Sequence, residues 1–385
     1  MLDTVQIPAP AFRQLIDRKP ISKSAVDRFL SCHSFPLQTD SGSTFVYRGD
    51  ADHVELHHWV YGAPGPQEFT RVEETDLWFL TLELPTCSRI EYKLVVESSG
   101  KRKLIRDRLN PLEAHDPFGA NSVCHGPGYS TPDWTRDQPG VPRGDTEILE
   151  IESEIFGETR LVDVYRPASN TAAADHPLLI VHDGNDFVRY SSLLTVLDNL
   201  IHRGEIAPLI VALTNSHERL VEYAGDPRHA RFLADELLPA LTNQFPVADI
   251  AASRGLLGAS FGAVASLHTS WLYPGLFGRL ALHSGSFAFH RRKPTKGTDE
   301  MAPVVAFQRL FRTSPRRPSD RVYVSCGQYE SLIVENRELV PILEETGMEV
   351  RYSEARDGHN WENWRDRLQE ALTYLFPGPA VELIG

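Results

Sequence analysis

The chain has 385 residues, of which 41% are hydrophobic and 24% are charged, and its formal net charge at pH 7 is −13. This length exceeds the roughly 250–300 residues at which a single core stops growing, so we expect two domains. The composition is globular, and a negative charge without a basic block argues against a surface for nucleic acid or for an acidic membrane.

Neither the N-terminus nor the cysteines point to export. The first twenty residues lack a basic segment followed by an apolar run, and no stretch of about 18 consecutive apolar residues occurs. We therefore expect a cytoplasmic protein. The four cysteines, Cys32, Cys87, Cys124 and Cys326, show no CxxC spacing, which predicts isolated thiols rather than a metal site or a disulfide framework.

The first part of the chain has an apolar pattern with a period of two. The segments HVELHHWVY (53–61), DLWFLTLEL (76–84) and RIEYKLVVES (89–98) each alternate in this way and end near Pro, Ser or Gly. Short alternating segments of this kind predict antiparallel strands. We predict a small all-β, Ig-like sandwich over residues 35–125, preceded by an N-terminal segment, 1–34.

One strand of this sandwich carries a candidate metal site. Alternation puts His53, Glu55 and His57 on the same side of the strand, and these residue types can bind a metal ion. A half-exposed strand ordinarily presents polar residues on its solvent face, however. We therefore predict that this face is solvated and that the protein has no metal site.

The pattern changes after a segment rich in Pro, Gly and Asp. We predict a linker over residues 126–144 and a second domain over 145–385. This domain opens with two alternating segments, 147–155 and 159–167, that read as a hairpin around Phe-Gly-Glu.

Beyond the hairpin, short apolar runs alternate with segments of helical spacing. Such alternation predicts a mostly parallel sheet with helices on both faces. The strand candidates are 177–184, 208–214, 254–260, 279–286 and 321–327, and the helix candidates are 191–204, 230–245, 262–272, 334–347 and 361–376.

Between one of these strands and the following helix lies Gly258-Ala259-Ser260-Phe261-Gly262. Gly-x-Ser-x-Gly in this context is typical of a nucleophile elbow, a sharp turn that presents the serine hydroxyl at the carboxyl end of the sheet. Small residues are needed at the two outer positions because the strand and the helix approach closely there. We predict that Ser260 is a nucleophile.

A serine nucleophile needs a base, and His359 has the expected place. It lies in the loop Asp-Gly-His-Asn after the strand-like run MEVRYSEA and before the last helix, as in hydrolases with the chain order Ser, acid, His. Three other histidines compete less well. His182 and His283 end strands, and His268 lies a helical turn or more beyond the elbow.

The acid that orients the base has two candidates. Glu330 lies three residues past Gly327, where the strand 321–327 ends, between nucleophile and base in the chain. Asp357 lies two residues from His359 and would need an unusual loop to reach the imidazole. We favour Glu330 and keep Asp357 as the alternative.

The remaining candidates surround the nucleophile. The backbone N–H of Phe261 is one expected oxyanion donor, and the N–H of Asn185, after the strand 177–184, is the expected second donor. The aromatic side chains of Phe187, Tyr190, Trp361 and Trp364 can either stack on an aromatic acyl group or belong to the core.

The substrate-binding candidates are Asp186, Phe187, Arg189 and Trp361.

The segments HDGNDF, ERLVEYAGD, FLADELLPAL, LLGASFGAVASL, LHSGSF, CGQYES and GHNWENWRDRL follow one another between residues 145 and 375. In this order and spacing the chain resembles the esterase D type α/β-hydrolases, and most of all the enterochelin esterases, which cleave the trilactone of catecholate siderophores. The resemblance implies an α/β-hydrolase fold and the site residues Ser260, Glu330, His359, Asn185 and Phe261. The first part also resembles the β-sandwich that precedes the hydrolase in those enzymes.

These observations favour a serine carboxylesterase that acts on a small-molecule ester without a cofactor. A siderophore lactone is the expected substrate. One alternative is a feruloyl or acetyl esterase of carbohydrate esters, with the sandwich as a carbohydrate-binding module. Two others are an acyltransferase and a binding protein of the same fold without turnover.

Overall fold

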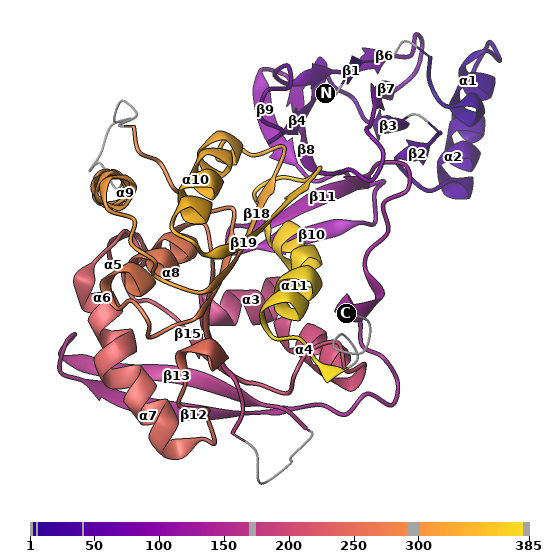
Figure 1. The fold of residues 1–385 in the computed structure, drawn as a ribbon. Coiled ribbons are helices and arrows are strands. Elements are labelled where there is room, and N and C mark those ends of the chain that lie inside the picture. Colours follow the sequence, from indigo (N-terminus) through magenta and orange to yellow (C-terminus); the bar gives the residue numbers. More distant parts are fainter. Residues whose placement is uncertain (1–2, 5–6, 41, 169–174, 291–300, 380–385) are drawn as a thin grey trace. The chain divides into compact units, whose positions relative to one another are not determined.

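The computed structural model describes residues 3–4, 7–40, 42–168, 175–290 and 301–379 (Figure 1). They form two compact units, each with its own core. The first unit comprises Met1–Thr131 together with two short segments from late in the chain, Gly327–Glu330 and Ala355–Asn360. The second comprises Pro132–Cys326, Ser331–Glu354 and Trp361–Gly385.

The first unit is an antiparallel sandwich that carries two helices. One sheet has the order β1-β7-β3-β2, with β6 beside β7, and the other has the order β10-β11-β8-β4-β5, with β9 beside β8. The strands are β1 (Asp3–Thr4), β2 (Leu37–Gln38), β3 (Gly42–Arg48), β4 (His53–His58), β5 (Gln67–Glu68), β6 (Thr70–Arg71), β7 (Leu77–Glu83), β8 (Arg89–Ser98), β9 (Lys101–Ile105), β10 (Glu113–Asp116) and β11 (Gly119–His125).

The period of two in these strands separates two cores. Phe45 of β3 packs between the two sheets with Leu56 and Tyr92, whereas its neighbour Val46 points to the opposite face. There Val46 packs against the helices α1 (Pro10–Ile16) and α2 (Lys23–Cys32). Successive side chains of a strand point to opposite faces, so one sheet contributes to both cores.

The second unit is built on an eight-stranded sheet with the order β12-β13-β15-β14-β16-β17-β18-β19. The hairpin β12–β13 is antiparallel, and β15, β14, β16, β17 and β18 are parallel to one another. The strands are β12 (Asp145–Ser153), β13 (Glu158–Arg166), β14 (Leu178–His182), β15 (Ile210–Thr214), β16 (Arg254–Ala259), β17 (Arg279–His283), β18 (Arg321–Gly327) and β19 (Glu349–Ala355).

Helices cover both faces of this sheet, which confirms the predicted α/β-hydrolase fold class. Leu256 of β16 belongs to one core and Leu257 to the other. One face is covered by α3 (Gly184–Ser191), α4 (Leu193–His202) and α11 (Trp361–Leu375), and the other by α7 (Leu238–Gln244), α8 (Phe261–Leu272), α9 (Ala302–Thr313) and α10 (Ile333–Glu345). The short helices are α5 (Arg219–Glu222), α6 (Pro227–Arg231), η1 (Asp133–Thr135) and η3 (Ala251–Ser253).

The helix expected over 230–245 is irregular. Its middle, Phe232–Leu237, is a π-helix, which α7 continues. Pro239 occupies the first turn of α7 and has no N–H to donate to the preceding turn, which favours a wider turn there.

Among the described residues, no helix is both long enough and apolar enough to cross a membrane.

Candidate active site

Ser260 lies in a strained turn between β16 and α8. Its backbone has φ 56° and ψ −117°, a combination that costs free energy in any residue other than glycine. A Cβ added at Gly258 would lie 2.2 Å from the carbonyl carbon and oxygen of Gly262, so only glycine fits where the chain doubles back. These are the geometric properties of a nucleophile elbow.

The first amides of α8 lie directly after this serine. Ser260 is the N-cap residue of α8, but its side chain makes no capping hydrogen bond. Its Oγ lies 3.1 Å from the Oγ of Ser286, and its N–H donates to the carbonyl of His283. The N-terminus of a helix stabilises negative charge, and the N–H of Phe261, the expected oxyanion donor, is the first of this helix.

The loop after β14 carries the second predicted donor. Asp183 has a positive φ of 54°, which turns the chain into α3. The N–H of Asn185 donates to the Oδ1 of Asn215 at 3.1 Å. An oxyanion that takes this donor must therefore replace the side chain of Asn215.

Arg219 links this loop to the elbow, which the sequence patterns did not predict. Its guanidinium donates to both carboxylate oxygens of Asp183 at 2.8–2.9 Å, and it lies 3.5 Å from the carbonyl of Ala259. Its Cζ is also 5.8 Å from the ring centroid of Phe261. In the sequence, only the place of Arg219 in the segment ERLVEYAGD, one of those that carry the family resemblance, pointed to a role for it.

The predicted acid and base lie together in the first unit. Nδ1 of His359 is 2.6 Å from Oε2 of Glu330, and the other carboxylate oxygen of Glu330 accepts from the N–H of Gly327 at 2.6 Å. The Glu330 side chain is completely buried, whereas 38% of the His359 side chain is exposed. A carboxylate at Nδ1 favours the tautomer in which Nε2 is the basic nitrogen.

Asp357, the alternative acid, has different partners. Its Oδ1 accepts from a guanidinium N–H of Arg89 at 3.2 Å, from the Gly358 N–H at 2.7 Å and from the Asn360 amide at 2.8 Å. Burial raises the pKa of Asp357 to about 7, and the charge of Arg89 opposes this rise. The structure thus brings Glu330 to the imidazole and Asp357 to Arg89.

Two of the predicted substrate-binding residues contact each other. Phe187 is fully buried and packs edge-on against Trp361, with centroids 5.3 Å apart, so its side chain belongs to the core. Trp361 is half-buried, and Tyr190 lies beside it at 5.8 Å.

The other two candidates lie in the same helix, α3. Arg189 is exposed and its Cζ lies 5.2 Å from the ring centroid of Tyr190. Burial and the nearby charge of Asp183 raise the pKa of Asp186.

The polar face of β4 differs from the expected arrangement. His53 and Glu55 lie near Glu68 of β5, with possible metal ligands within 4.8 Å of one another. His57 instead packs edge-on against Trp59. Glu55 accepts from both His53 and Arg102, so its carboxylate is neutralised by protein groups. The absence of a metal site stays a prediction.

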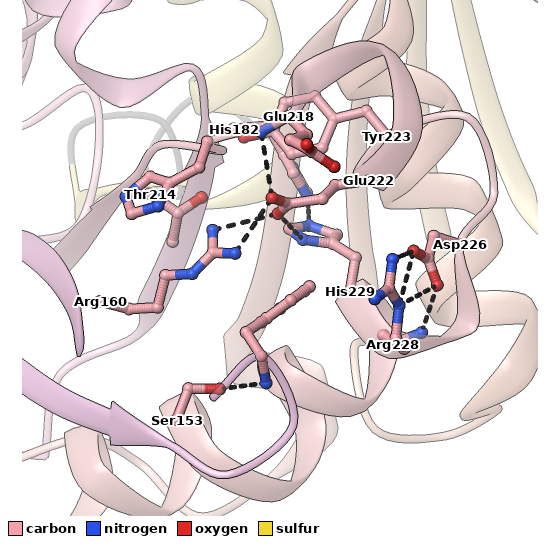
Figure 2. A network of polar contacts seen from close by, with 12 residues as sticks. Ser153, Arg160, His182, Thr214, Glu218, Glu222, Tyr223, Asp226, Arg228 and His229 are labelled. Carbon is pink, nitrogen blue, oxygen red and sulfur yellow. Dashed lines mark hydrogen bonds and ion pairs between the residues drawn. The ribbon is translucent and has the colours of Figure 1, made fainter. Parts of the chain in front are cut away.

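Behind the elbow, the second unit contains a buried polar network that was not predicted (Figure 2). His182, at the end of β14, has its Nε2 3.0 Å from Nε2 of His229 and its Nδ1 3.1 Å from Oγ of Ser266 in α8. His229 lies 3.7 Å from Glu222, whose two oxygens accept from the guanidinium of Arg160 at 3.0 and 3.1 Å. The network therefore joins β13, β14 and the helix of the elbow.

Acid is expected to weaken the second unit through its buried histidines. Burial lowers the pKa of His268 to about 4 and that of His283 to about 3, and it lowers the pKa of His182 well below its usual value. The unfolded chain, with a pKa of about 6.5, binds more protons as the pH falls from about 6.5 to about 5. The free energy of unfolding then drops by about 2 kcal/mol per histidine.

The urea-unfolding transition of the second unit, in the wild type and in His268→Phe at about pH 7.5 and about pH 5, tests this expectation. Phenylalanine keeps an aromatic ring near Phe307, which packs edge-on against His268, but binds no proton. The loss of stability between the two pH values should be about 2 kcal/mol smaller in the variant. An equal loss in both proteins would contradict the assignment.

Comparison with known proteins shows the family to which this chain belongs. A family model described as "Putative esterase" matches residues 153–375, which is more than half of the chain. The iron(III) enterobactin esterase of Escherichia coli (strain K12) is 24% identical over 338 residues, which cover 81% of this chain and 82% of that protein.

Solved structures show the same fold. The enterobactin esterase from Shigella flexneri, determined in the presence of enterobactin, superimposes with a TM-score of 0.74 at 23% identity, over 93% of this chain and 99% of that one. A ferulic acid esterase superimposes with a TM-score of 0.53 at 17% identity, over 62% of this chain and 99% of that one. The chain is an α/β-hydrolase and belongs to the esterase family whose model it matches.

Proposed function

We propose that this esterase is a serine carboxylesterase in which Ser260, Glu330 and His359 act as nucleophile, acid and base. The observation that carries the proposal is the strained backbone of Ser260 in the elbow. The order of the strands supports it. In the chain, Ser260 directly follows β16 and Glu330 lies three residues past the end of β18, and both strands belong to the parallel part of the sheet.

The proposed reaction has two steps. In the first, Nε2 of His359 takes the hydroxyl proton of Ser260 while Oγ attacks the ester carbonyl carbon, and the oxyanion accepts from the N–H groups of Phe261 and Asn185. The tetrahedral intermediate collapses, and the alcohol leaves with the proton from His359. In the second, His359 takes a proton from water as the water oxygen attacks the acyl carbon, and it then returns this proton to Oγ of Ser260 as the carboxylic acid leaves.

A siderophore-type ester is the substrate that we propose. The E. coli and Shigella enterobactin esterases match across both units of this chain, over 81% and 93% of it. The ferulic acid esterase matches 62% of it, which supports a feruloyl ester as the second candidate.

Hydrolysis of three esters distinguishes these candidates. We expect a catecholate trilactone to be cleaved with a higher kcat/KM than methyl ferulate or p-nitrophenyl acetate, because the two-unit organisation is shared with trilactone esterases. The reverse order would favour the feruloyl alternative, and no hydrolysis of any of the three would contradict the proposal.

The nucleophile can be identified without the natural substrate. A fluorophosphonate should modify Ser260, because such reagents react with an activated serine. Trypsin is expected to release residues 255–279 as one peptide that contains Ser260, Ser266 and Ser270. Fragmentation should place the label on Ser260, and the other two serines are internal controls because both are buried. A label on either control residue, or none on the peptide, would contradict the assignment.

A further inference from the structure

The loops of the proposed acid and base belong to the sandwich unit. The segments Gly327–Glu330 and Ala355–Asn360 cluster with Met1–Thr131. Two backbone hydrogen bonds join the segments to each other, from Gln328 N–H to the Ala355 carbonyl at 2.7 Å and from Tyr329 N–H to the Asp357 carbonyl at 3.0 Å. The segments that carry Glu330 and His359 are therefore part of the sandwich unit, and its residues can contact them.

The backbone of the sandwich contacts both segments. The N–H of Arg89, the first residue of β8, donates to the carbonyl of Arg356 at 2.9 Å. The N–H of Tyr61 donates to the carbonyl of Tyr329 at 2.9 Å, and Tyr329 belongs to the core between the two sheets. Both segments are thus fixed at the backbone.

The side chain of Arg89 holds the residues on either side of His359. It is completely buried. One guanidinium nitrogen lies 3.2 Å from Oδ1 of Asp357 and 3.1 Å from Oδ1 of Asn360, and the other lies 3.0 Å from Glu91. Asp357 in turn accepts from the Asn360 amide. A planar guanidinium suits such a set of acceptors, and an ammonium cannot reproduce it.

Removal of this cation has a defined consequence for the loop. Asp357 is buried, and its carboxylate is stabilised by Arg89, Asn360 and the Gly358 N–H. Burial already raises the pKa of Asp357 to about 7. Without the arginine, this carboxyl group must take up a proton or leave its site, because an unpaired buried charge is unfavourable.

We propose that Arg89 of the sandwich is a positioning residue, which orients His359 against Glu330 through Asp357 and Asn360. The inference deepens the proposed function, because it rests on His359 as the base. It assigns a role in catalysis to the N-terminal unit.

The variants Arg89→Met and Arg89→Lys test this role, with Arg102→Met as the matched control. Arg102 lies on β9, next to β8, and pairs with Glu55 through an exposed side chain. We expect Arg89→Met to lower kcat roughly 10- to 100-fold with a smaller change in KM, because displacement of a catalytic group by about 1 Å has effects of this size. The kcat of Arg89→Lys should lie between those of Arg89→Met and the wild type, and the kcat of Arg102→Met should match the wild type.

A proton resonance gives a second readout that a purely structural residue would leave unchanged. The proton between Nδ1 of His359 and Glu330, at 2.6 Å, should give a far-downfield NMR signal that Glu330→Gln removes. We expect Arg89→Met to broaden or shift this signal. A folded Arg89→Met protein with an unchanged signal and wild-type kcat would overturn the proposal.

If Arg89→Met does not fold, Arg89→Lys and Asp357→Asn decide the question. Both must lower kcat and alter the resonance, and wild-type values in both would overturn the proposal. The test is separable from that of the function. Absence of ester hydrolysis in the wild type would contradict the esterase mechanism, whereas the resonance reports on the His359–Glu330 pair with or without turnover.

Discussion

The replacement of Glu330 by glutamine is expected to lower kcat/KM for ester hydrolysis by about 10⁴-fold. The carboxylate of Glu330 accepts from His359 at 2.6 Å and from the Gly327 N–H at 2.6 Å. A glutamine that keeps its carbonyl oxygen on the Gly327 N–H presents an amide N–H to Nδ1. The imidazole then carries its proton on Nε2 and cannot take the proton of the serine.

Steady-state kinetics of Glu330→Gln and of Asp357→Asn together test which carboxylate is the acid. Asp357 contacts Arg89, Gly358 and Asn360, and an asparagine there fills the same space but removes the charge that pairs with Arg89, which shifts the loop. We therefore expect Asp357→Asn to lower kcat/KM roughly 10- to 100-fold, because only the position of the loop changes. A larger loss in Asp357→Asn than in Glu330→Gln would reverse the assignment.

The sequence contained enough information for the sheet and the elbow because local constraints determine both. The strands β14, β16 and β18 are buried on both faces of the sheet, so their segments are apolar throughout and stand out between helices. The elbow requires glycine at position 258, because a Cβ there meets the backbone of Gly262. A steric requirement of this kind can be recognised from a five-residue motif alone.

The polar contacts around the site could not be predicted, because they join residues far apart in the chain. Arg89 begins the predicted strand 89–98, yet its side chain is buried against Asp357, 268 positions later. Periodicity reports which residues share a face but not what covers that face. For the same reason the sequence left open whether Phe187 stacks on a ligand or packs in the core, where it lies.

The buried polar network around Glu222 also joins residues that are far apart in the chain. Its disruption is expected to lower the stability of the second unit strongly. Glu222→Leu should destabilise the second unit by about 3 kcal/mol, because it leaves the guanidinium of Arg160 in the interior without its main partner. Both side chains are about 95% buried. The estimate lies at the lower end of the usual range because the half-exposed Glu158 still contacts the guanidinium.

Hydrogen exchange of the β14 amides measures this loss locally, which avoids treating a chain of two units as a single cooperative transition. The amides should exchange about 100-fold faster, since each 1.4 kcal/mol is a factor of ten. Burial raises the pKa of Glu222, but the hydrogen bond to His229 and the pairing with Arg160 outweigh it and lower this pKa. The wild type should therefore show no comparable loss from this group at mildly acidic pH.

The double variant Arg160→Met, Glu222→Leu separates the ion pair from the space that it fills. Apolar side chains of similar size remove both charges together, so most of the protection should return. His182 contacts the elbow helix through Ser266, and the same double variant therefore also tests whether the network is needed for the geometry of Ser260. Protection that returns without esterase activity would assign the network to the site, whereas recovery of both would limit its role to stability.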